Sequence, residues 1–345
     1  MDTIDANSGG IEVQNVASQK EAGILHEVII IGSGPAGLTA ALYAARAELA
    51  PLVIAGFTPG GQLMMTTEVE NFPGFIQGIM GPDLMNNMIK QAERFGTKLV
   101  YEVAVGVDFK DGSEARSNAG AGADAEVRAR AFTIKTDKSE YRARAVILAM
   151  GADANWLGLP NEQRLRGKGV SACATCDGFF FKAKEVAVVG GGDSAMEEAN
   201  FLTKYANKAV VVHRRGEFKA SKIMLERARQ NPKIEFVMNS EVADVLGADK
   251  VEGLRLRNTV SGEFSELRVD GLFLAIGHSP NTKILQGKVE LDERGYVKVS
   301  GNTRTSVEGI FVAGDISDPR YRQAVTAAGM GCMAALDVEK FLAEK

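Results

Sequence analysis

The chain has 345 residues, of which 45% are hydrophobic and 24% are charged, and its formal net charge is −4. This length and composition predict a globular protein of about two domains with sizeable cores. The negative charge argues against a nucleic-acid partner, because phosphate binding needs a basic face. No apolar run approaches the roughly 18 residues that span a bilayer, so no membrane partner is expected.

The N-terminal segment, residues 1–25, has no basic start, no apolar stretch and no arginine. We therefore expect a flexible tail rather than a targeting peptide. The chain contains three cysteines, too few for a disulfide scaffold. This favours a cytoplasmic protein in which any disulfide turns over.

The predicted elements begin with an apolar strand at 26–31, HEVIII, that runs into a glycine. An alanine-rich helix at 35–49 and a strand at 51–55 complete a β-α-β unit. Residues 56–82 carry Gly-Gly, Pro-Gly and Gly-Pro pairs and are expected to form a loop. Further on we predict a helix at 83–95, strands at 132–135 and 141–149, and a flexible surface loop at 111–125.

The same pattern then starts again. A strand at 185–189, a helix at 193–205 and a strand at 209–212 form a second β-α-β unit, and strands at 272–276 and 310–313 each run into a glycine. Each β-α-β unit of this type can bind one nucleotide. The sequence therefore predicts an α/β fold with two Rossmann-like nucleotide-binding domains, the first of them discontinuous in sequence.

The first unit turns at Gly32-Ser33-Gly34-Pro35-Ala36-Gly37, which has the spacing GxGxxG. In this pattern the first glycine permits a tight turn, the second lets the backbone approach a diphosphate, and the third lets helix and strand pack closely. The diphosphate would lie at the helix N-terminus, where N–H groups and the helix dipole favour anions. The alternative is a bare strand–helix turn, but the flanking strand and helix favour a nucleotide site.

The second unit turns at Gly190-Gly191-Gly192-Asp193-Ser194-Ala195, with alanine in the place of the third glycine. About 20 residues further on, an acidic side chain would bind the ribose 2′-hydroxyl of NAD. Here the strand ends in His213-Arg214-Arg215, with Lys219 close behind. Cations at this point suit a 2′-phosphate, so the site is predicted to prefer NADP(H). The alternative is a solvated basic edge of the sheet.

The first unit differs, because its second strand ends without an acidic residue. A different kind of adenine dinucleotide binding must therefore be invoked there. Gly314-Asp315 follows a later strand and places a carboxylate where it can accept a hydrogen bond from a polyol such as ribityl. Gly151 ends another strand with a backbone-permissive residue.

Cys173 and Cys176 form a CxxC pair that Asp177 follows directly. A zinc site needs about four ligands, and with only Cys332 and three scattered histidines available no metal is expected. A buried, inert pair is a second alternative. We favour a dithiol/disulfide couple, because CxxC beside a β-α-β unit is a redox motif. Asp177 can then shuttle a proton to a leaving thiolate, although it can also cap a helix; Cys332 is expected to be a core residue.

Taken together, these motifs resemble the low-molecular-weight NADPH-dependent thioredoxin reductases over about residues 25–345. The combination of CATCDG before the second nucleotide turn with a C-terminal YRQA run is highly specific. The resemblance is carried by the following stretches: 32–37, 61–63, 70–71, 173–178, 190–195, 213–215, 277–278, 314–315 and 321–324.

The resemblance implies FAD on the first unit and NADPH on the second, in a homodimer whose partner is thioredoxin. The FAD-binding domain would comprise 26–151 and 278–345, and residues 152–277 would form the NADPH-binding domain that carries the redox cysteines. Electrons would pass from NADPH through FAD and the Cys173–Cys176 disulfide to the disulfide of thioredoxin, with Asp177 as the acid/base. The flavin site would be lined by Ser33, Gly34, Pro35, Ala36, Gln62, Asn71, Asp315, Arg322, Gln323 and Ala324, next to Gly32, Gly37, Gly61 and Gly314.

Two positions depart from the family pattern: Met150 stands where related sequences have threonine, and Lys219 where they have arginine. The first should matter little if the backbone makes the contact. The lysine at 219 replaces a guanidinium that binds phosphate with two parallel hydrogen bonds by a single ammonium charge, and this is expected to weaken NADPH binding.

The position of the thiols leads to a further hypothesis. The nicotinamide and the disulfide would belong to one domain, and they cannot both stack on one face of the flavin. We therefore expect domain rotation about hinges near Gly151 and Gly277–His278. Docking of an acidic, partly apolar partner is a second hypothesis, and ordinary packing is its alternative. The docking residues would be Arg164, Arg166, Lys168, Phe179 and Phe180.

Two rival functions remain open from the sequence alone. An FAD-dependent dithiol oxidase of related fold would keep CxxC but use oxygen and lack an NADPH site, and the basic stretch at 213–219 argues against it. A non-catalytic NADP-binding redox sensor would bind both cofactors and fail to reduce thioredoxin.

Overall fold

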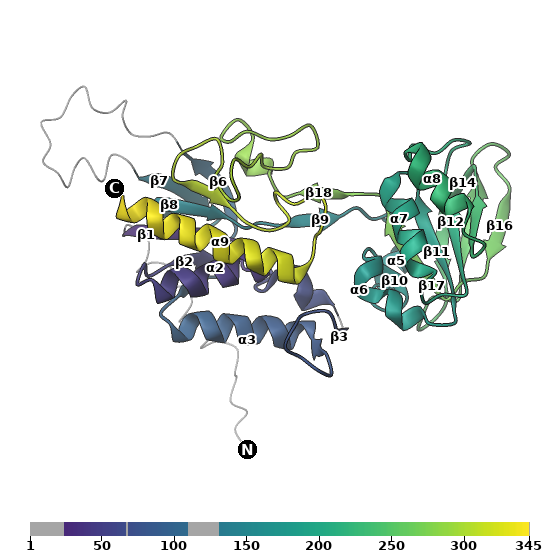
Figure 1. Ribbon diagram of the computed structural model, residues 1–345, viewed down its shortest axis with the longest axis horizontal. Coiled ribbons are helices and arrows are strands. Elements are labelled where there is room, and N and C mark those ends of the chain that lie inside the picture. Colours follow the sequence, from purple (N-terminus) through teal and green to yellow (C-terminus); the bar gives the residue numbers. More distant parts are fainter. Residues whose placement is uncertain (1–23, 67, 110–130, 345) are drawn as a thin grey trace, which may run out of the picture. The chain divides into compact units, whose positions relative to one another are not determined.

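The computed structural model describes residues 24–66, 68–109 and 131–344, so the expectations for residues 1–23 and for the 111–125 loop lie outside the described residues. The chain divides into two compact units. The first runs to Ala152 and resumes at Pro280, and the second comprises Asp153–Ser279 (Figure 1).

The first unit is built on a seven-stranded sheet with the order β5-β2-β1-β8-β7-β6, and β19 also pairs with β8. The strands around β1 are parallel, as are β8 and β19, whereas β7 pairs antiparallel with both β8 and β6. Their bounds are β1 Leu25–Ile31, β2 Leu52–Ile54, β5 Lys98–Val100, β6 Ala104–Asp108, β7 Phe132–Thr136, β8 Glu140–Leu148 and β19 Ile310–Val312.

The apolar run of β1 reflects burial on both faces of this sheet. Val28 and Ile30 pack with the helices on one face, while Ile29 and Ile31 belong to a second cluster on the other face. Because successive side chains of a strand point to opposite faces, a central parallel strand covered on both sides is apolar throughout. Figure 1 shows α2 (Pro35–Arg46) and α9 (Ala324–Ala343) lying together along this sheet.

Two predicted elements of the first unit differ in extent. The helix expected at 35–49 ends at Arg46, because Glu48 and Ala50 have left-handed φ values of 61° and 43° that a helix cannot continue. The loop expected at 56–82 contains a short 3₁₀ helix η1 and a two-stranded sheet. These elements, with the helix that follows, are η1 Gly61–Met65, β3 Glu68–Val69, β4 Ile79–Met80 and α3 Gly81–Arg94.

The second unit contains a five-stranded parallel sheet with the order β10-β17-β11-β12-β13, and a separate antiparallel sheet with the order β14-β15-β16. The parallel strands are β10 Val170–Ser171, β11 Glu185–Gly190, β12 Lys208–Val212, β13 Ile234–Val237 and β17 Gly271–Ala275. The antiparallel strands are β14 Ser240–Leu246, β15 Gly253–Asn258 and β16 Phe264–Leu267.

The parallel sheet of the second unit is again covered on both faces. In β11, Val186 and Val188 pack in a cluster with the helices, while Ala187 and Val189 pack in another with the antiparallel sheet. The helices and 3₁₀ turn of this unit are α5 Pro160–Arg164, α6 Ala174–Asp177, η3 Gly178–Phe181, α7 Asp193–Leu202 and α8 Lys222–Arg229. The expected helix at 193–205 thus ends at Leu202 and continues only as turns.

The chain passes between the units twice, and the two passages pair with each other as β9 (Ala152–Ala154) and β18 (His278–Pro280). Gly151 and Gly277, which precede the two strands, have positive φ values of 69° and 96°. These are conformations that side chains other than glycine rarely adopt. Glycine at these points is therefore required by the turn of the backbone.

The two β-α-β units predicted from the sequence are present, and the α/β fold class is confirmed. None of the helices in the described part of the chain is both long enough and apolar enough to cross a membrane.

Candidate functional site

The first glycine turn joins β1 to α2 by very close packing. A Cβ atom on Gly32 would overlap the carbonyl group of Ala149, and one on Gly37 would overlap the carbonyl oxygen of Gly32. Gly32 also has a φ of 112°. The first and third glycines are therefore required by the protein itself, as the sequence pattern predicts.

Gly34 has the opposite environment, since a Cβ on it would meet nothing within 4 Å. Gly34 is the N-cap residue of α2 and provides no side-chain hydrogen bond to the first turn of the helix. A helix N-terminus without a side-chain cap offers its N–H groups to an anion. Open space in front of this backbone fits the diphosphate of a dinucleotide.

Two polar side chains tie neighbouring segments to this turn. The hydroxyl of Ser33 donates to the carbonyl oxygen of Ala55 at 2.6 Å and accepts the N–H of Gly60 at 3.0 Å. The side-chain amide of Gln62 donates to the carbonyl oxygen of Ala152 at 2.5 Å. A Cβ on Gly61 would lie 3.3 Å from the Cα of Gly34, so the 60–62 segment lies directly against the glycine turn.

The C-terminal segment supplies the rest of this region. A Cβ on Gly314 would lie 2.8 Å from the Cβ of Ala36, which places the Gly314-Asp315 turn beside the start of α2. Asn71 donates to the side-chain oxygen of Gln323 at 3.3 Å. The residues predicted to bind the flavin therefore all belong to the first unit, and its tertiary fold brings their segments together from distant parts of the chain.

Asp315 lies in an unusual electrostatic environment. Burial and, to a smaller extent, the nearby Asp318 carboxylate raise the pKa of its carboxyl group to about 6, against the opposing effect of Arg322. Asp318 in turn accepts the backbone N–H groups of Arg320, Tyr321 and Arg322. These bonds hold Arg322 at a left-handed φ of 50°, so Asp318 shapes the loop that leads to Gln323.

The second glycine turn joins β11 to α7 in the same way. A Cβ on Gly190 would approach the carbonyl oxygen of Ala275 and the Cβ of Ala195, whereas one on Gly192 would meet nothing within 4 Å. Gly192 is the N-cap of α7 and also makes no side-chain capping bond. This turn therefore has the same open helix N-terminus as the first, and alanine at the third position fits.

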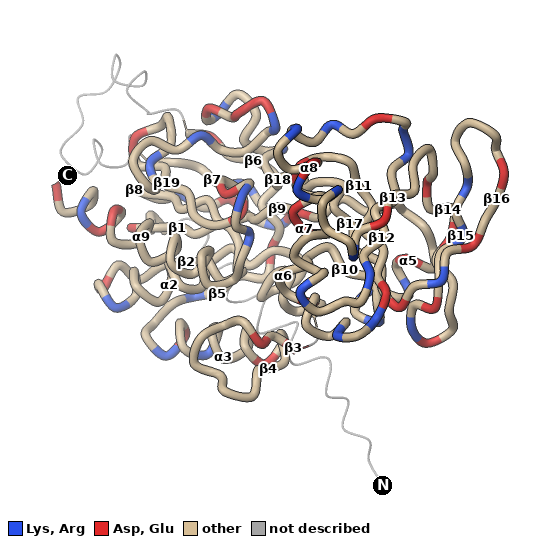
Figure 2. Tube along the Cα trace, turned by 45° about the vertical axis from the view of Figure 1, so that its right-hand side comes forward, with Lys and Arg blue, Asp and Glu red and all other residues tan. Residues whose placement is uncertain are grey.

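The predicted basic segment lies beside this second turn. Figure 2 shows lysine and arginine positions interspersed with acidic ones along the chain. Arg214, Arg215 and Lys219 are exposed cations close together in the sequence. The backbone N–H of Lys219 donates to the carbonyl oxygen of Gly191 at 2.8 Å. Arginine and lysine next to an open glycine turn fit the 2′-phosphate of NADP.

His213 does not share this exposure. Its side chain is buried, its ring stacks on Phe218 with centroids 4.9 Å apart, and its Nε2 lies 2.9 Å from the carbonyl oxygen of Glu217. A Cβ on Gly191 would overlap the imidazole ring. The His213 ring therefore packs between Gly191 of the glycine turn and Phe218 of the basic segment.

Cys173 and Cys176 are joined as a disulfide, with Cα atoms 5.3 Å apart. Cys173 is the N-cap residue of the four-residue helix α6, and Cys176 is exposed. The buried, inert pair considered from the sequence is therefore wrong, and the two sulfurs are bonded to each other as a redox couple requires. Cys332 is free and half-buried on α9 rather than in the core as expected.

Asp177 directly follows the disulfide at the end of α6. Burial raises the pKa of its carboxyl group, and a hydrogen bond with Ser171 partly offsets the shift. Asp177 precedes η3 but makes no side-chain capping bond to it, which removes the capping alternative. A carboxyl group with a raised pKa, directly after the disulfide in the chain, is suited to acid/base work.

The comparisons with known proteins agree with this geometry. Residues 26–331 match the family of pyridine nucleotide-disulphide oxidoreductases. The thioredoxin reductase of Mycolicibacterium smegmatis is 54% identical over 93% of this chain and 98% of its own length. The chain belongs to the thioredoxin reductases. The membership confirms the oxidoreductase class and the disulfide redox centre predicted from the sequence.

Two further relatives define the match. A bifunctional thioredoxin reductase/thioredoxin from Mycobacterium leprae is 54% identical over 93% of this chain, which covers 66% of that protein. The solved thioredoxin reductase from Giardia duodenalis superposes with a TM-score of 0.83 at 41% identity, covering 93% of this chain and all of the other.

Some functional positions of this thioredoxin reductase escape sequence reasoning. Asp318, Gly191 and Phe218 each shape a predicted binding segment through contacts that the sequence analysis did not predict. Asp318 alone carries a local signal, because an aspartate two to four residues before a loop often accepts its N–H groups. The other two act through contacts across the fold.

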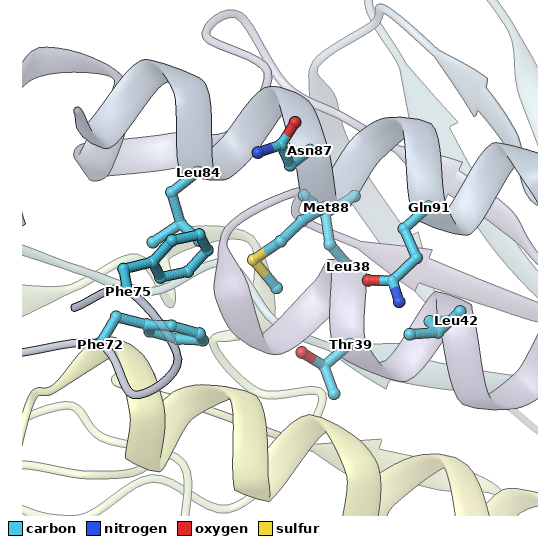
Figure 3. Close-up of a pocket in the computed structure, with 9 residues that line it drawn as sticks. All are labelled: Leu38, Thr39, Leu42, Phe72, Phe75, Leu84, Asn87, Met88 and Gln91. Atoms are coloured by element: carbon cyan, nitrogen blue, oxygen red, sulfur yellow. The ribbon is translucent and has the colours of Figure 1, made fainter. Parts of the chain in front are cut away.

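A separate apolar groove lies between α2 and α3, with a volume of about 230 Å³. Figure 3 shows Phe72, Phe75, Leu84 and Met88 lining one end of it, and Leu42 and Gln91 the other. No residue predicted to bind a cofactor lines this groove. It is therefore distinct from the two nucleotide turns.

Proposed function

We propose that this thioredoxin reductase binds FAD on the first unit and NADPH on the second, and reduces the disulfide of a thioredoxin through Cys173 and Cys176. The observation that carries the proposal is the disulfide in the same unit as the basic second glycine turn. The name of the Mycobacterium leprae relative joins both proteins in one chain, which supports thioredoxin as the partner.

When bound, FAD would supply the hydride and electron chemistry between NADPH and the disulfide. The chain's residues would hold it: Gly34 leaves space for the diphosphate, and the Asp315 carboxylate would accept hydrogen bonds from the ribityl hydroxyls. Gln62 and Asn71 are already bonded to protein partners, to Ala152 and Gln323. We infer that these two side chains shape the flavin site by ordering the 60–71 and 322–324 segments.

The disulfide chemistry belongs to the second unit. After two-electron reduction of the Cys173–Cys176 bond, one thiolate attacks the partner's disulfide and releases one partner thiolate. The other cysteine then attacks the mixed disulfide, which restores the Cys173–Cys176 bond and releases the second partner thiolate. Asp177 supplies and takes up the proton at the leaving sulfur.

The placement of these groups motivates the rotation hypothesis. Both the second glycine turn and the disulfide belong to one unit, whereas the flavin residues belong to the other. Because the nicotinamide and the disulfide cannot occupy one flavin face together, the units must exchange between two arrangements. The paired passages at β9 and β18, each preceded by a glycine at positive φ, are the proposed hinges.

The partner surface is proposed around Phe179 and Phe180, whose side chains are 53% and 37% exposed just after the disulfide. Arg166 lies over the ring of Trp156 at 3.5 Å, and Arg164 donates to the carbonyl oxygens of Gly247 and Ala248. Both arginines therefore make contacts within the chain itself, which favours ordinary packing over partner docking for these two side chains. We keep the aromatic pair and the exposed Lys168 as the proposed docking residues.

We further propose a homodimer in the cytoplasm. Tyr43 on α2 and Met333 and Leu336 on α9 are large apolar side chains that are 39–51% exposed on the first unit. Exposed apolar side chains gathered on neighbouring helices are typical of a contact with a second copy. Light scattering coupled to gel filtration tests the dimer, and charged substitutions at Met333 and Leu336 should give monomers.

An anaerobic titration with NADPH tests the electron path. We expect NADPH to bleach the flavin absorbance of the purified protein and of a Cys176→Ser variant. The variant should take up one electron pair fewer per chain and should fail to reduce thioredoxin. Cys332→Ser is the matched control, because this free thiol lies in the first unit and should leave the titration unchanged.

The rival functions predict different outcomes. A flavin that NADPH does not bleach while dithiols do would favour the dithiol oxidase. Bleaching without any reduction of thioredoxin, despite an intact disulfide, would favour the redox sensor.

A further inference from the structure

The first residue of α7 poses an electrostatic problem for the proposed NADPH site. Asp193 directly follows Gly192, at the helix N-terminus that would receive the diphosphate. A carboxylate there is favourable for the helix itself but repels a bound anion. Another interaction must therefore explain why this position has an acidic side chain.

The structure supplies that reason in a contact across 28 positions of sequence. The Oδ1 atom of Asp193 accepts the backbone N–H of Ser221 at 2.6 Å. Ser221 is the N-cap residue of α8 and ends the exposed segment that begins at Arg214. The carboxylate is thus directed at the basic segment.

Further contacts hold the same end of the basic segment, near Ser221, against the second glycine turn. The N–H groups of Lys219 and Ala220 both donate to the carbonyl oxygen of Gly191, at 2.8 and 3.0 Å. His213 stacks on Phe218 and packs against Gly191. The segment that carries Arg214, Arg215 and Lys219 is therefore held at one end by the glycine turn itself.

These contacts connect the two regions that would bind different parts of the same nucleotide. The glycine turn would receive the diphosphate, and the exposed cations would receive the 2′-phosphate. Their separation must match the nucleotide, and a loop that samples other positions binds more weakly in proportion to the time it spends there. A bond from α7 to Ser221 removes part of that freedom.

We propose that Asp193 is a positioning residue for nucleotide specificity: its carboxylate latches the basic segment 214–221 to the second glycine turn and so sets the preference for a 2′-phosphate. This inference rests on the proposed NADPH site. It assigns to Asp193, a residue of the predicted second nucleotide turn, a hydrogen bond with Ser221 as its role.

Calorimetric titration of the full-length protein with NADP⁺ and NAD⁺ tests the latch, since the oxidised nucleotides cause no electron transfer. Loss of one hydrogen bond at an exposed site converts to about a twofold to tenfold change in affinity. Asp193→Ala should weaken NADP⁺ by this factor and leave NAD⁺ unchanged or slightly tighter. Asp193→Asn keeps an acceptor oxygen and should keep the preference for NADP⁺.

Asp270→Ala provides the matched control. Asp270 is an exposed aspartate of the same unit that also accepts a backbone N–H, from Glu185 at 3.1 Å, but at the start of β11 rather than beside the glycine turn. Both nucleotide affinities should be unchanged in this variant. A thermal unfolding scan of each variant shows whether any loss of binding reflects loss of folding.

Three results would separate the possibilities. An unchanged NADP⁺ to NAD⁺ ratio in Asp193→Ala overturns the latch. Equal effects of the alanine and asparagine variants also overturn it, because the charge and not the hydrogen bond would then be responsible. A wild-type protein that does not distinguish NADP⁺ from NAD⁺ refutes the proposed NADPH site itself.

Discussion

At the scale of single residues, Asp177 is our proposed group for proton transfer. It directly follows the disulfide, and burial raises the pKa of its carboxyl group above the ordinary value. The group therefore keeps its proton to a higher pH than an exposed aspartate does, and can donate it to a leaving thiolate.

Asp177→Asn should therefore slow the reoxidation of reduced enzyme by thioredoxin by about a hundredfold, at the lower end of the range for acid/base catalysis. Stopped-flow measurement of that half-reaction gives the rate. The reduction of the flavin by NADPH should be unaffected, because it does not involve the sulfurs. A variant that reacts with thioredoxin at the wild-type rate would exclude Asp177 as the acid/base.

Asp315 leads to a prediction about pH. The pKa of this carboxyl group is about 6 in the folded protein, against about 3.9 in an unfolded chain. Since the folded state holds the proton more tightly, this group's stabilising contribution is full below about pH 4 and is lost as the pH rises through about 6.

Between about pH 4 and 6, the FAD-free wild type should consequently lose stability relative to the Asp315→Asn variant, which lacks this titrating group. Thermal unfolding at a series of pH values measures the difference between the two proteins. All other titrating groups contribute equally to both. Parallel curves would show that the environment of Asp315 does not raise its pKa in solution.

At the scale of elements, each nucleotide turn is a strand and a helix joined where only some positions tolerate a side chain. A Cβ on Gly37 would overlap the backbone of Gly32, whereas one on Gly34 would meet nothing within 4 Å. Gly34 also has a φ of −70°, which every residue adopts. Gly37 is therefore required for packing, whereas Gly34 leaves space for the proposed ligand.

Substitution by alanine should separate these roles. Gly37→Ala should destabilise the FAD-free protein by about 1–3 kcal/mol, as overpacked sites do. Gly34→Ala should leave that stability within about 0.5 kcal/mol of the wild type and should weaken FAD binding. Denaturant unfolding gives the first quantity and flavin release the second. Equal effects on both quantities by the two variants would contradict the assignment.

The elements also show where sequence reasoning succeeds. Strands β1 and β11 were predicted within two residues, because strands buried on both faces are apolar throughout. Strands β14, β15 and β16 and helix α8 were not predicted. Their partly exposed, charge-rich sequences carry no strong period, and pairing with neighbouring strands decides their structure.

At the scale of the whole molecule, the chain forms two units that each sandwich a largely parallel sheet between two apolar clusters. The unit with the disulfide is one uninterrupted segment, and the unit with the residues predicted to bind the flavin is formed by the two segments on either side of it. Such an insertion leaves two passages between the units, so motion between them is confined to two short segments.

The rotation hypothesis is tested by tethering. A non-reducible crosslinker between one engineered cysteine on each unit should abolish turnover when it holds the units in one arrangement, while one of the two half-reactions continues. The single-cysteine variants treated with the same reagent are the control. Full turnover in the crosslinked protein would refute the hypothesis.

Local sequence patterns were sufficient to predict the redox and nucleotide-binding chemistry proposed for this protein. The two glycine turns, the CxxC pair and the basic stretch after the second unit are local patterns, because each acts within a few residues of chain. The tertiary structure decided how these patterns are supported. Asp193 reaches Ser221, Asp318 holds the loop at Arg322, and His213 turns inward beneath Gly191. These contacts join residues that are distant in sequence. The role of each side chain therefore depends on its burial and orientation in the fold as well as on its residue type.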